Sequence, residues 1–501
     1  MKNTKSLLSS LKKLKLAAGL VLCGAAIAHA GAEPIDPALS KDEIKQLTKE
    51  AFFWGMQQVG FYELRHQFTQ NEKNPAFRGI NRVQYTRRLF DASMRFATTP
   101  NASTLYSGGS FDLSIEPILI DAAAVNEDRY WSIQAGDQYS RWFFFVGSPF
   151  TGNQAQRYLI VGPNWKGRFP AGLRATQIVR SPSDSVSLAM RVAVKRADSQ
   201  EDLAAAVKLM EGVYMAPLSL WENNGGRPLP LDRQPVVKGK YRTFPRMPEI
   251  GDLTKTMTPI DYMQLVSLVI NDPSMTNRVD SKKEIETLAR LSRLGLREGM
   301  LFDPDGVTTA QREAIEQGFF EARAEARRAV DSDLLDMNGW QLQTSLFYDE
   351  NNYVLRAGVA EVAWGSPVPF QSHTIGFGLA DAEGYALDGR HAYTLTFELD
   401  QLPPVTEFWE MPLYDDYGYF VPNPINRFSV TSYQLAAGVL HVSDGKLTLY
   451  LQSERPTDPD HARNWLPTPA QGMFRLAPRF YGPTSSLIDG SYAMPKIERV
   501  R

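Results

Sequence analysis

The stretch Tyr130-Trp131-Ser132-Ile133-Gln134-Ala135-Gly136-Asp137 carries an alternation of side chains that decides how this chain is expected to fold. In an extended strand, successive side chains point to opposite faces, so the polar residues share one face and Trp131 and Ile133 share the other. A hydrogen-bonding face opposite an apolar face suits the wall of a binding cleft. The same pattern also fits an ordinary sandwich strand whose polar face meets water.

Short strand patterns extend over much of the chain on both sides of this stretch. Residues 78–191 have the pattern of strands and turns, and a second run of strand patterns occupies residues 393–452. Within the second run, Asp444-Gly445 is typical of a tight hairpin, and we expect it to join strands at 440–442 and 447–452. Repeated short strands separated by turns are typical of an antiparallel sandwich or barrel.

Helical patterns gather in two regions of the chain. The first begins at a capping box formed by Ser40 and Glu43 and runs to about residue 65. The second contains three helices between residues 258 and 336, of which the first starts at Thr258-Pro259 and the second at Ser281. No parallel βαβ unit is evident.

These patterns predict an α+β fold that is mainly β. We expect two antiparallel domains of β-sandwich or jelly-roll type, separated by a helical segment at residues 253–338. The N-terminal domain, with its leading helix, covers residues 31–252, and the C-terminal domain covers residues 339–501. The boundary at 252 follows from a segment rich in Pro, Gly and Arg at residues 222–252.

The first 30 residues have the features of a cleavable secretory signal. Five lysines and no acidic residue accompany an apolar stretch from Leu16 to Ile27, and Ala28-His29-Ala30 then supplies the pattern that signal peptidase reads. The apolar stretch is shorter than the about 20 residues that span a bilayer. We therefore expect cleavage after Ala30, a periplasmic or secreted protein, and no membrane span after cleavage. An uncleaved membrane anchor is the alternative.

The composition limits the partners of the mature protein. The full chain has 54 Lys and Arg against 56 Asp and Glu, a formal net charge of −2, and loss of the signal lysines makes it more acidic. No basic stripe of the kind that binds nucleic acid is present, so no nucleic-acid partner is expected. The single cysteine, Cys23, lies in the signal, so the mature chain has no disulfide and no cysteine ligand for a metal.

Familiar catalytic and cofactor signatures are missing from the sequence. It contains no G-x-S-x-G elbow, no Walker loop and no G-x-G-x-x-G followed by a helix. The histidines of the mature chain are too far apart for a local two-histidine metal motif, although ligands dispersed in the sequence can still converge in space. We therefore expect no cofactor and no metal.

Clusters of mixed aromatic and polar residues are the strongest candidates for a functional site. They lie at residues 101–107, 130–137 and 407–415. In the third cluster, alternation places Glu407 with Trp409 and Met411, and it places Phe408 and Glu410 on the opposite face. A carboxylate beside an aromatic edge can orient a sugar hydroxyl or raise its own pKa for acid–base chemistry.

The candidate site is a cleft between the two domains, lined by residues from these clusters. The acid–base candidates are Asp137 and Glu407, and Tyr106 is the candidate proton donor. Amide, guanidinium and indole groups suit a polar or anionic ligand, and the ligand-binding candidates of these types are Asn101, Gln134, Arg356, Trp409, Arg427 and Trp465. An arginine fork equally often ties a loop to its domain through backbone carbonyls.

Taken in order, the clusters resemble two bacterial domain families that usually occur in tandem, the domains of unknown function 1254 (N-terminal) and 1214 (C-terminal). The N-terminal resemblance is carried by residues 101–107, 130–137, Tyr158-Leu159-Ile160-Val161-Gly162-Pro163 and Ser181-Pro182. The C-terminal resemblance is carried by Pro403-Pro404-Val405, Phe408-Trp409, Tyr414-Asp415, Asn423-Pro424, Arg427, Asn464-Trp465-Leu466-Pro467 and Arg479-Phe480-Tyr481.

The resemblance implies two β-sandwich or jelly-roll-like domains and a frequent location outside the cytoplasm, but it implies no agreed activity. One position departs from the family pattern, because Ser103 stands where relatives usually have Asp before Thr-Leu-Tyr. If that Asp serves as a metal ligand or general base in relatives, this chain lacks it.

Three functions are compatible with the sequence. The first is a hydrolase or lyase that acts on a small molecule in the cleft between the domains. The second is a binding protein that uses the same cleft without chemistry. The third is a structural or assembly protein of the cell envelope whose clusters brace the loops of two sandwiches. The oligomeric state is left open, a homo-oligomer included.

Overall fold

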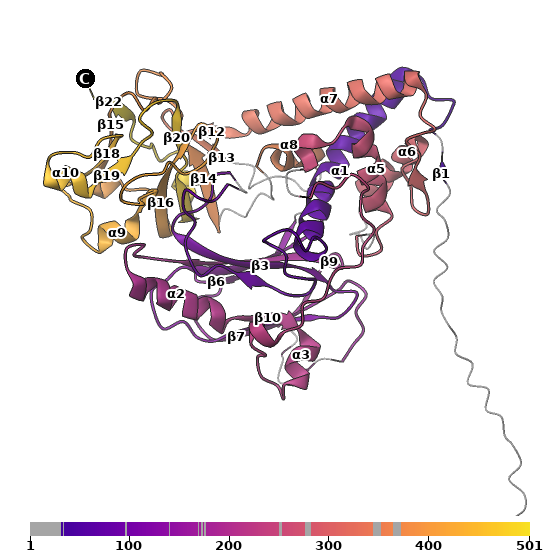
Figure 1. Ribbon diagram of the computed structural model, residues 1–501, viewed down its shortest axis with the longest axis horizontal. Helices are drawn as coiled ribbons and strands as arrows, with labels where there is room; N and C mark the ends of the chain where they lie inside the picture. Colours follow the sequence, from indigo (N-terminus) through magenta and orange to yellow (C-terminus); the bar gives the residue numbers. More distant parts are fainter. Residues whose placement is uncertain are drawn as a thin grey trace, which may run out of the picture.

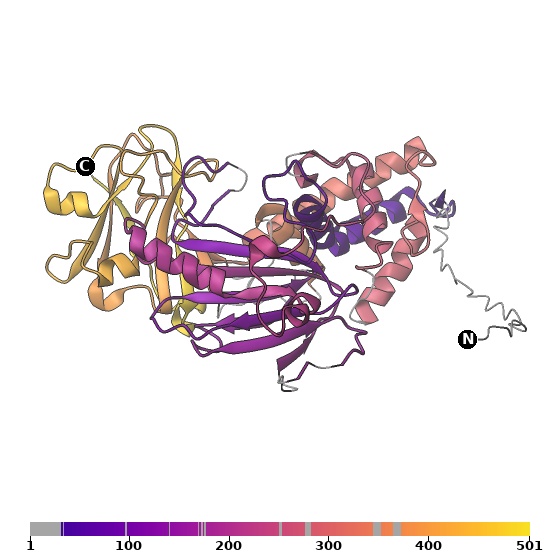
Figure 2. The same ribbon diagram turned by 60° about the horizontal axis from the view of Figure 1, so that its bottom comes forward.

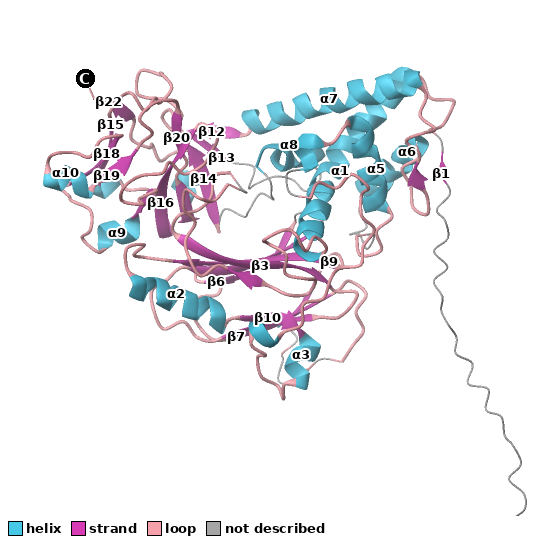
Figure 3. Cartoon of the chain, viewed as in Figure 1, coloured by secondary structure: helices cyan, strands magenta, loops and turns pink. Residues whose placement is uncertain are grey.

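The computed structural model describes residues 32–33, 35–95, 98–139, 141–168, 170–171, 174, 177–249, 253–275, 282–343, 352–363 and 372–500. The expected signal segment at residues 1–30 and the expected helix cap Ser281 lie outside these ranges. Among the described residues, several antiparallel sheets combine with helices, and no sheet closes into a barrel, which confirms the predicted α+β class. Figure 3 shows the helices α1, α5, α6, α7 and α8 on one side and the strands in two groups, with shorter helices beside the strands.

The N-terminal sandwich consists of two stacked sheets. The five-stranded sheet has the order β2 (Gln84–Tyr85), β3 (Thr104–Asp112), β9 (Ser185–Ala193), β5 (Trp131–Asp137) and β6 (Trp142–Gly147). The four-stranded sheet has the order β10 (Tyr214–Pro217), β4 (Ile118–Ala122), β7 (Gln156–Val161) and β8 (Ile178–Arg180). The helix α2 (Gln200–Gly212) places Ala206 and Met210 in the core of this sandwich.

Alternation along β5 works as the sequence predicts. Trp131, Ile133 and Ala135 point into the core between the two sheets, where they meet β4 and β7. Ser132 and Gln134 therefore lie on the outer face of the five-stranded sheet, away from the apolar core. The packing of the sandwich thus fixes which face of the sheet is polar.

The C-terminal sandwich also has two sheets. The first has the order β12 (Leu334–Asp336), β13 (Gln341–Gln343), β14 (His373–Phe377), β21 (Arg479–Pro483), β16 (Val405–Asp415) and β17 (Ser429–Thr431), and β20 (Phe474–Leu476) pairs with β16. The second has the order β19 (Trp465–Pro467), β18 (Lys446–Gln452), β15 (Tyr393–Glu398) and β22 (Ile497–Arg499). Figure 2 shows the N-terminal sandwich lying between this sandwich and the helices.

The predicted hairpin at Asp444-Gly445 is half right. Both residues have positive φ, 50° and 74°, as the two central residues of a type I′ turn require. The strand β18 follows the turn, but residues 440–442 form no strand, and β18 pairs instead with β15 and β19. The turn is a local property of two residues, whereas the partner of a strand is chosen by the whole sheet.

A helical body forms the third part of the molecule. It contains α1 (Lys41–Thr69), α5 (Pro259–Ile270), α6 (Lys282–Leu291), α7 (Thr309–Ser332) and α8 (Tyr353–Ala363). The capping box predicted at the start of α1 is present, since Glu43 N–H donates to the Ser40 hydroxyl and Ser40 N–H donates to the Glu43 carboxylate. Thr258 caps α5 in the same way, with Pro259 at its first position.

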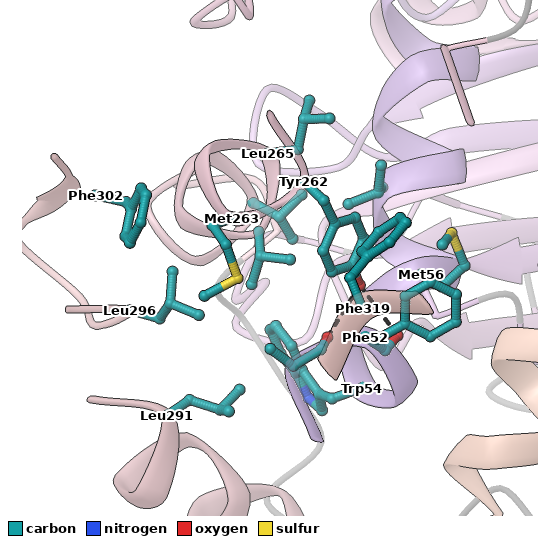
Figure 4. Packing of buried hydrophobic residues seen from close by; sticks show 14 of the residues in the cluster. Phe52, Trp54, Met56, Tyr262, Met263, Leu265, Leu291, Leu296, Phe302 and Phe319 are labelled. Carbon is teal, nitrogen blue, oxygen red and sulfur yellow. Dashed lines mark hydrogen bonds between the residues drawn. The ribbon is translucent and has the colours of Figure 1, made fainter. Parts of the chain in front are cut away.

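The core of the helical body joins α1 to helices that follow the N-terminal sandwich in the sequence. Phe52 of α1 packs against Tyr262 of α5 and Phe319 of α7, with ring centroids 5.5 and 5.2 Å away (Figure 4). The Tyr262 hydroxyl donates to the backbone carbonyls of Ala51 and Phe52, at 2.9 and 3.0 Å. Helices outside residues 253–338 thus complete this body, and the domain boundaries drawn from the sequence stay predictions.

Short elements complete the described chain. They are β1 (Ala32–Glu33) paired with β11 (Leu301–Phe302), the helices α3 (Leu218–Asn223), α4 (Leu253–Thr256), α9 (Ser432–Ala436), α10 (Pro459–Arg463) and α11 (Ser485–Ile488), and the 3₁₀ turns Leu231–Arg233, Ser292–Leu294 and Leu399–Gln401. None of the helices in the described ranges has both the length and the apolarity that crossing a membrane requires. Figure 1 shows how the three parts are arranged.

Candidate functional site

The outer face of the five-stranded sheet carries polar and small side chains in rows across the strands. The strand register places Tyr106, Arg191 and Ser132 in one row, then Gly108, Ala189 and Gln134, then Ser110, Ser187 and Gly136. We call these nine residues the polar face. Five of them are only partly buried, although they lie on the central strands of the sheet: Tyr106, Gly108, Ser187, Ala189 and Arg191.

The C-terminal sandwich reaches one end of the polar face through the start of β14. The Gln134 side-chain amide donates to the Ser372 hydroxyl at 3.1 Å, and the Ser372 hydroxyl lies 3.2 Å from Nδ1 of His373. On the other side, a guanidinium N–H of Arg191 donates to the amide oxygen of Gln134. A chain of hydrogen bonds therefore runs from Arg191 to His373 across the contact between the two domains.

These residues and Tyr106 form what we call the Arg191 cluster: Tyr106, Gln134, Arg191, Ser372 and His373. The Arg191 guanidinium lies 5.5 Å from the centre of the Tyr106 ring. The Tyr106 hydroxyl makes no hydrogen bond within the described part of the chain. The cluster thus presents a guanidinium and an uncommitted phenol side by side on a partly accessible surface.

The charge of the Arg191 cluster is uncompensated. Within the described ranges, no carboxylate lies at ion-pair distance from Arg191. Burial, together with the guanidinium groups of Arg191 and Arg479, lowers the pKa of His373 well below its ordinary value, so its imidazole is neutral at pH 7. The cluster therefore carries one positive charge on Arg191 and no negative charge.

A second, deeper group of contacts joins the domains beside the Arg191 cluster. We call it the brace, and it consists of Asn101, Glu410, Tyr414, Arg479 and Tyr481. The Asn101 amide donates to the Glu410 carboxylate at 2.6 Å and to the Tyr481 hydroxyl at 2.7 Å. The backbone N–H of Ala102 donates to the other oxygen of Glu410 at 3.0 Å. Tyr414 donates to the carbonyl of Pro100, and Arg479 donates to the carbonyl of Thr99.

The brace leaves its own polar atoms little capacity for a ligand. Asn101 was predicted to contact a ligand, but its Oδ1 accepts from the backbone of Ser103 and Thr104 while its amide holds Glu410. Burial raises the pKa of Glu410, an effect partly opposed by the Arg479 guanidinium. Ser103, which stands where relatives usually have Asp, is itself buried, and its hydroxyl donates to Oδ1 of Asn101 at 3.4 Å. An Asp at this position would place a second carboxylate beside Glu410.

Asp137 and Arg356 each contact the loop between β5 and β6. The Asp137 carboxylate accepts from the backbone N–H groups of Tyr139 and Arg141 and forms an ion pair with Arg141. Arg356, on α8, donates to the Tyr139 carbonyl at 2.6 Å. Both side chains therefore fix the loop and connect the sheet to the helical body, instead of facing the Arg191 cluster.

The remaining predicted residues of the C-terminal domain are also engaged within the protein. Trp409 lies in the apolar core and stacks on Phe397, because its face of β16 turns inward. Arg427 donates to the carbonyls of Arg463 and Trp465, and the Trp465 indole donates to the carbonyl of Gln452. These placements differ from the cleft wall expected from the sequence, since each polar group has a backbone partner.

Glu407 lies at the contact between the domains. Its carboxylate accepts from the Ser148 hydroxyl at 2.9 Å, and burial raises its pKa. Of the predicted residues, the structure thus brings Tyr106 and Gln134 into the Arg191 cluster, while Asn101 and Glu407 lie at other points of the domain contact. Arg191, Ser372 and His373 were not singled out from the sequence. Alternation in residues 185–193 places Arg191 on the polar face and could have indicated it.

Surface hollows occur elsewhere. Two of them, of about 200 and 300 Å³, lie in the helical body next to Leu288 and Arg290 respectively. Among the described residues, no group of three or more His, Cys, Asp or Glu side chains is arranged to hold a metal ion.

The fold and these contacts define a protein of two β-sandwich domains that are joined by a buried polar brace and accompanied by a helical body. Residues 80–217 match the family described as Protein of unknown function (DUF1254), and residues 375–485 match Protein of unknown function (DUF1214). The chain therefore carries these two domains in tandem, in the order that the sequence resemblance indicated. The matched residues belong to the two sandwiches, and most of the helical body lies between them.

A solved structure with a TM-score above 0.5 shares the fold of this chain. The crystal structure of the VPA0106 protein from Vibrio parahaemolyticus is 21% identical, with a TM-score of 0.65, and the match covers 91% of this chain and 100% of that chain. A putative uncharacterized protein from Burkholderia cenocepacia is 12% identical, with a TM-score of 0.39 and coverage of 92% and 95%. Comparison with curated proteins gives no match.

Proposed function

We propose that this protein binds a small anionic molecule at the Arg191 cluster, between the polar face and the C-terminal sandwich. The observation that carries the proposal is the state of Arg191, which is partly buried and held by Gln134 without a carboxylate partner in the described ranges. A guanidinium that is removed from water normally has an anionic partner, because burying an unpaired charge is unfavourable. A bound anion supplies that partner.

The neighbours of Arg191 suit an anion of organic origin. The guanidinium fork holds a carboxylate or phosphate through two parallel hydrogen bonds. The Tyr106 hydroxyl, which has no partner in the described part of the chain, can donate a further hydrogen bond. The rows beyond Arg191 carry only small residues apart from Gln134.

The geometry supports binding better than chemistry. Each carboxylate predicted to act as an acid or base is engaged elsewhere, Asp137 with Arg141 and Glu407 with Ser148. The buried Glu410 is held by Asn101 and Ala102 within the brace. The hydrolase or lyase hypothesis would have to rely on Tyr106 and the neutral His373 alone, so the non-catalytic binding protein is our conclusion.

Export of the mature chain is part of this proposal. Its support is the lysine-rich, apolar and Ala28-His29-Ala30 sequence of the first 30 residues. Expression of the full chain in a bacterial host, followed by cell fractionation and N-terminal sequencing, is expected to give a periplasmic or secreted protein that begins at Gly31. A protein that stays in the cytoplasm with residues 1–30 attached would contradict export.

A thermal-shift screen of residues 31–501 tests anion binding. Acetate, hexanoate, benzoate and inorganic phosphate are the probes, with uncharged hexanol as the control ligand. A ligand at a hundredfold excess over its dissociation constant stabilises the native state by about 2.7 kcal/mol, which is a clear shift in melting temperature. Arg191→Ala is expected to abolish the shift, whereas Arg227→Ala, at an exposed position of the same domain, is expected to retain it.

The outcome separates anion binding from an assembly role. If no anion raises the melting temperature of a protein that melts cooperatively, the binding proposal fails and the assembly role gains support. If hexanol shifts the melting temperature as much as hexanoate, the site recognises the hydrocarbon part of the ligand and not its charge. Sedimentation velocity on the same sample tests whether the protein is a homo-oligomer.

A further inference from the structure

A second arginine without a carboxylate partner lies near the polar face. Arg78 donates from Nε to the Ala76 carbonyl at 3.0 Å and from Nη1 to the carbonyl of Gly108. Its Nη2 makes no hydrogen bond within the described ranges, and no carboxylate there lies at ion-pair distance. Two guanidinium groups, Arg78 and Arg191, are thus uncompensated in the same part of the domain.

The position of Arg78 follows from the helix above it. Its guanidinium lies 3.7 Å from the centre of the Phe68 ring, near the C-terminal end of α1. One turn earlier in α1, Arg65 donates to the hydroxyl of Ser185, which continues the polar face along β9. Arg78 therefore lies between α1 and β3, on the side of the sheet that the polar face occupies.

The two arginines contact neighbouring positions of the same sheet. Arg78 contacts Gly108, and Arg191 lies directly opposite Tyr106, two residues along the same strand. Alternate residues of a strand are about 6.6 Å apart. Ala189 lies opposite Gly108 in the register, so neither residue of this row has a long side chain.

From this arrangement we infer that Arg78 is a second anion anchor and that the ligand carries two separated anionic groups, of which linear dicarboxylates are the simplest class. The inference rests on the proposed function, since it requires that Arg191 holds one of the two groups. Burial lowers the pKa of Arg78 to about 10, with no acidic neighbour to oppose the shift. An anion beside Arg78 would oppose this lowering of the pKa, because it stabilises the charged guanidinium.

Matched pairs of ligands test the second anchor. Isothermal titration of residues 31–501 compares butyrate with succinate, hexanoate with adipate, and octanoate with suberate, so that each pair differs only in the second carboxylate. In at least one pair, the dicarboxylate is expected to bind about tenfold or more tightly than the monocarboxylate, as one charge-assisted hydrogen-bonded contact provides. Arg78→Ala is expected to remove this preference and to leave monocarboxylate affinity unchanged.

The failure of this inference is distinguishable from the failure of the proposed function. If monocarboxylates bind through Arg191 but no dicarboxylate binds better, the second anchor is wrong and the anion site stands. If Arg78→Ala lowers the affinity for both ligands of a pair equally, Arg78 maintains the fold and does not bind the second carboxylate. Arg78→Lys guards against misfolding of the alanine variant, because it keeps the charge and is expected to keep part of the dicarboxylate preference. Absence of binding by every ligand overturns both proposals.

Discussion

The side-chain amide of Asn101 lies 2.6 Å from the carboxylate of Glu410, although 309 residues separate the two in the sequence. Asn101 precedes β3 in the N-terminal sandwich, and Glu410 lies on β16 in the C-terminal sandwich. Both are fully buried, so the contact between the two domains contains a desolvated charge that is held by hydrogen bonds. The relative position of the domains therefore depends on a few directional contacts and not on apolar packing alone.

Replacing Glu410 by Gln should destabilise the protein despite the equal size of the side chains. Both carboxylate oxygens of Glu410 accept from N–H groups, one from Asn101 and one from Ala102. Either orientation of the new amide places its NH₂ group against one of these donors. We expect a loss of about 1–3 kcal/mol in the free energy of unfolding, measured by urea denaturation. Glu498→Gln, on the exposed face of β22, is the control and should change it little. Equal changes in the free energy of unfolding for the two substitutions would contradict the hydrogen bonds assigned to Glu410 in the brace.

The buried ion pair between Arg65 and Asp272 should be sensitive to removal of its acid. Nη2 of Arg65 lies 2.5 Å from Asp272, and both side chains are almost inaccessible, at 1% and 4% exposure. Asp272→Asn leaves the guanidinium buried and unpaired, and the expected loss is about 3–5 kcal/mol. The exposed pair Lys238–Glu72 serves as the control, because Glu72→Gln should cost at most about 1 kcal/mol. Calorimetry on both variants measures the difference, and similar melting temperatures would argue against burial of Arg65.

Two glycines in long helices should respond in opposite ways to alanine. A methyl group on Gly358 of α8 would collide with the backbone carbonyl of Ala326 in α7. Gly358→Ala is therefore expected to cost about 1–3 kcal/mol. Nothing lies within 4 Å of the same position on Gly60 of α1, so Gly60→Ala should stabilise the protein by up to about 1 kcal/mol. Thermal melts of the two variants give the comparison, and an unchanged melting temperature in Gly358→Ala would contradict the close approach of α7 and α8.

His373 should make stability depend on pH. Its pKa in the folded state lies well below 6.5, because burial and the positive charges of Arg191 and Arg479 disfavour the imidazolium. As the pH falls below about 6.5, the unfolded chain binds a proton that the native state excludes, so stability is lost on acidification. The loss of stability therefore grows as the pH falls further below 6.5.

His373→Gln isolates that contribution. The advantage of the wild type over this variant should be larger at pH 7.5 than at pH 5.5, in melts recorded at both values. Substitution of His461 by Gln is the comparison, because this side chain is exposed to solvent. A pH-independent difference between the wild type and His373→Gln would show that the imidazole titrates normally in the native protein.

Features of the fold that depend on neighbouring residues could be predicted from the sequence, whereas contacts between residues far apart in the sequence could not. The helix start at Ser40 and Glu43, the start at Thr258-Pro259 and the turn at Asp444-Gly445 each depend on residues within one turn of the chain. The alternation at Ser132 and Gln134 likewise assigned the right face. By contrast, the helix α1 was expected to accompany the N-terminal domain, yet its core partners lie on α5 and α7. No short-range signal reveals a partner that far away in the sequence.

The candidate site shows the same limit. Arg427 and Trp465 have the residue types of a binding site, but each donates to backbone carbonyls that the sequence cannot place. Trp409 could be assigned to one face of its strand, but alternation does not tell which face turns inward. Alternation along β9 could have placed Arg191 on the polar face, whereas His373 gave no signal, because its neighbourhood arises only when two domains meet.

The hydrogen bond from Tyr262 to Ala51 also bears on the biosynthesis of this chain, since 211 residues separate its ends. At a synthesis rate of about 5–20 residues per second, α1 leaves the ribosome roughly 10–40 s before α5 can cover its apolar side. During that interval the entire N-terminal sandwich is made. The nascent chain therefore exposes Phe52 and its neighbours for much longer than a chain whose first helix packs on the next one. We expect this stretch to be a principal binding site for chaperones before the polypeptide folds.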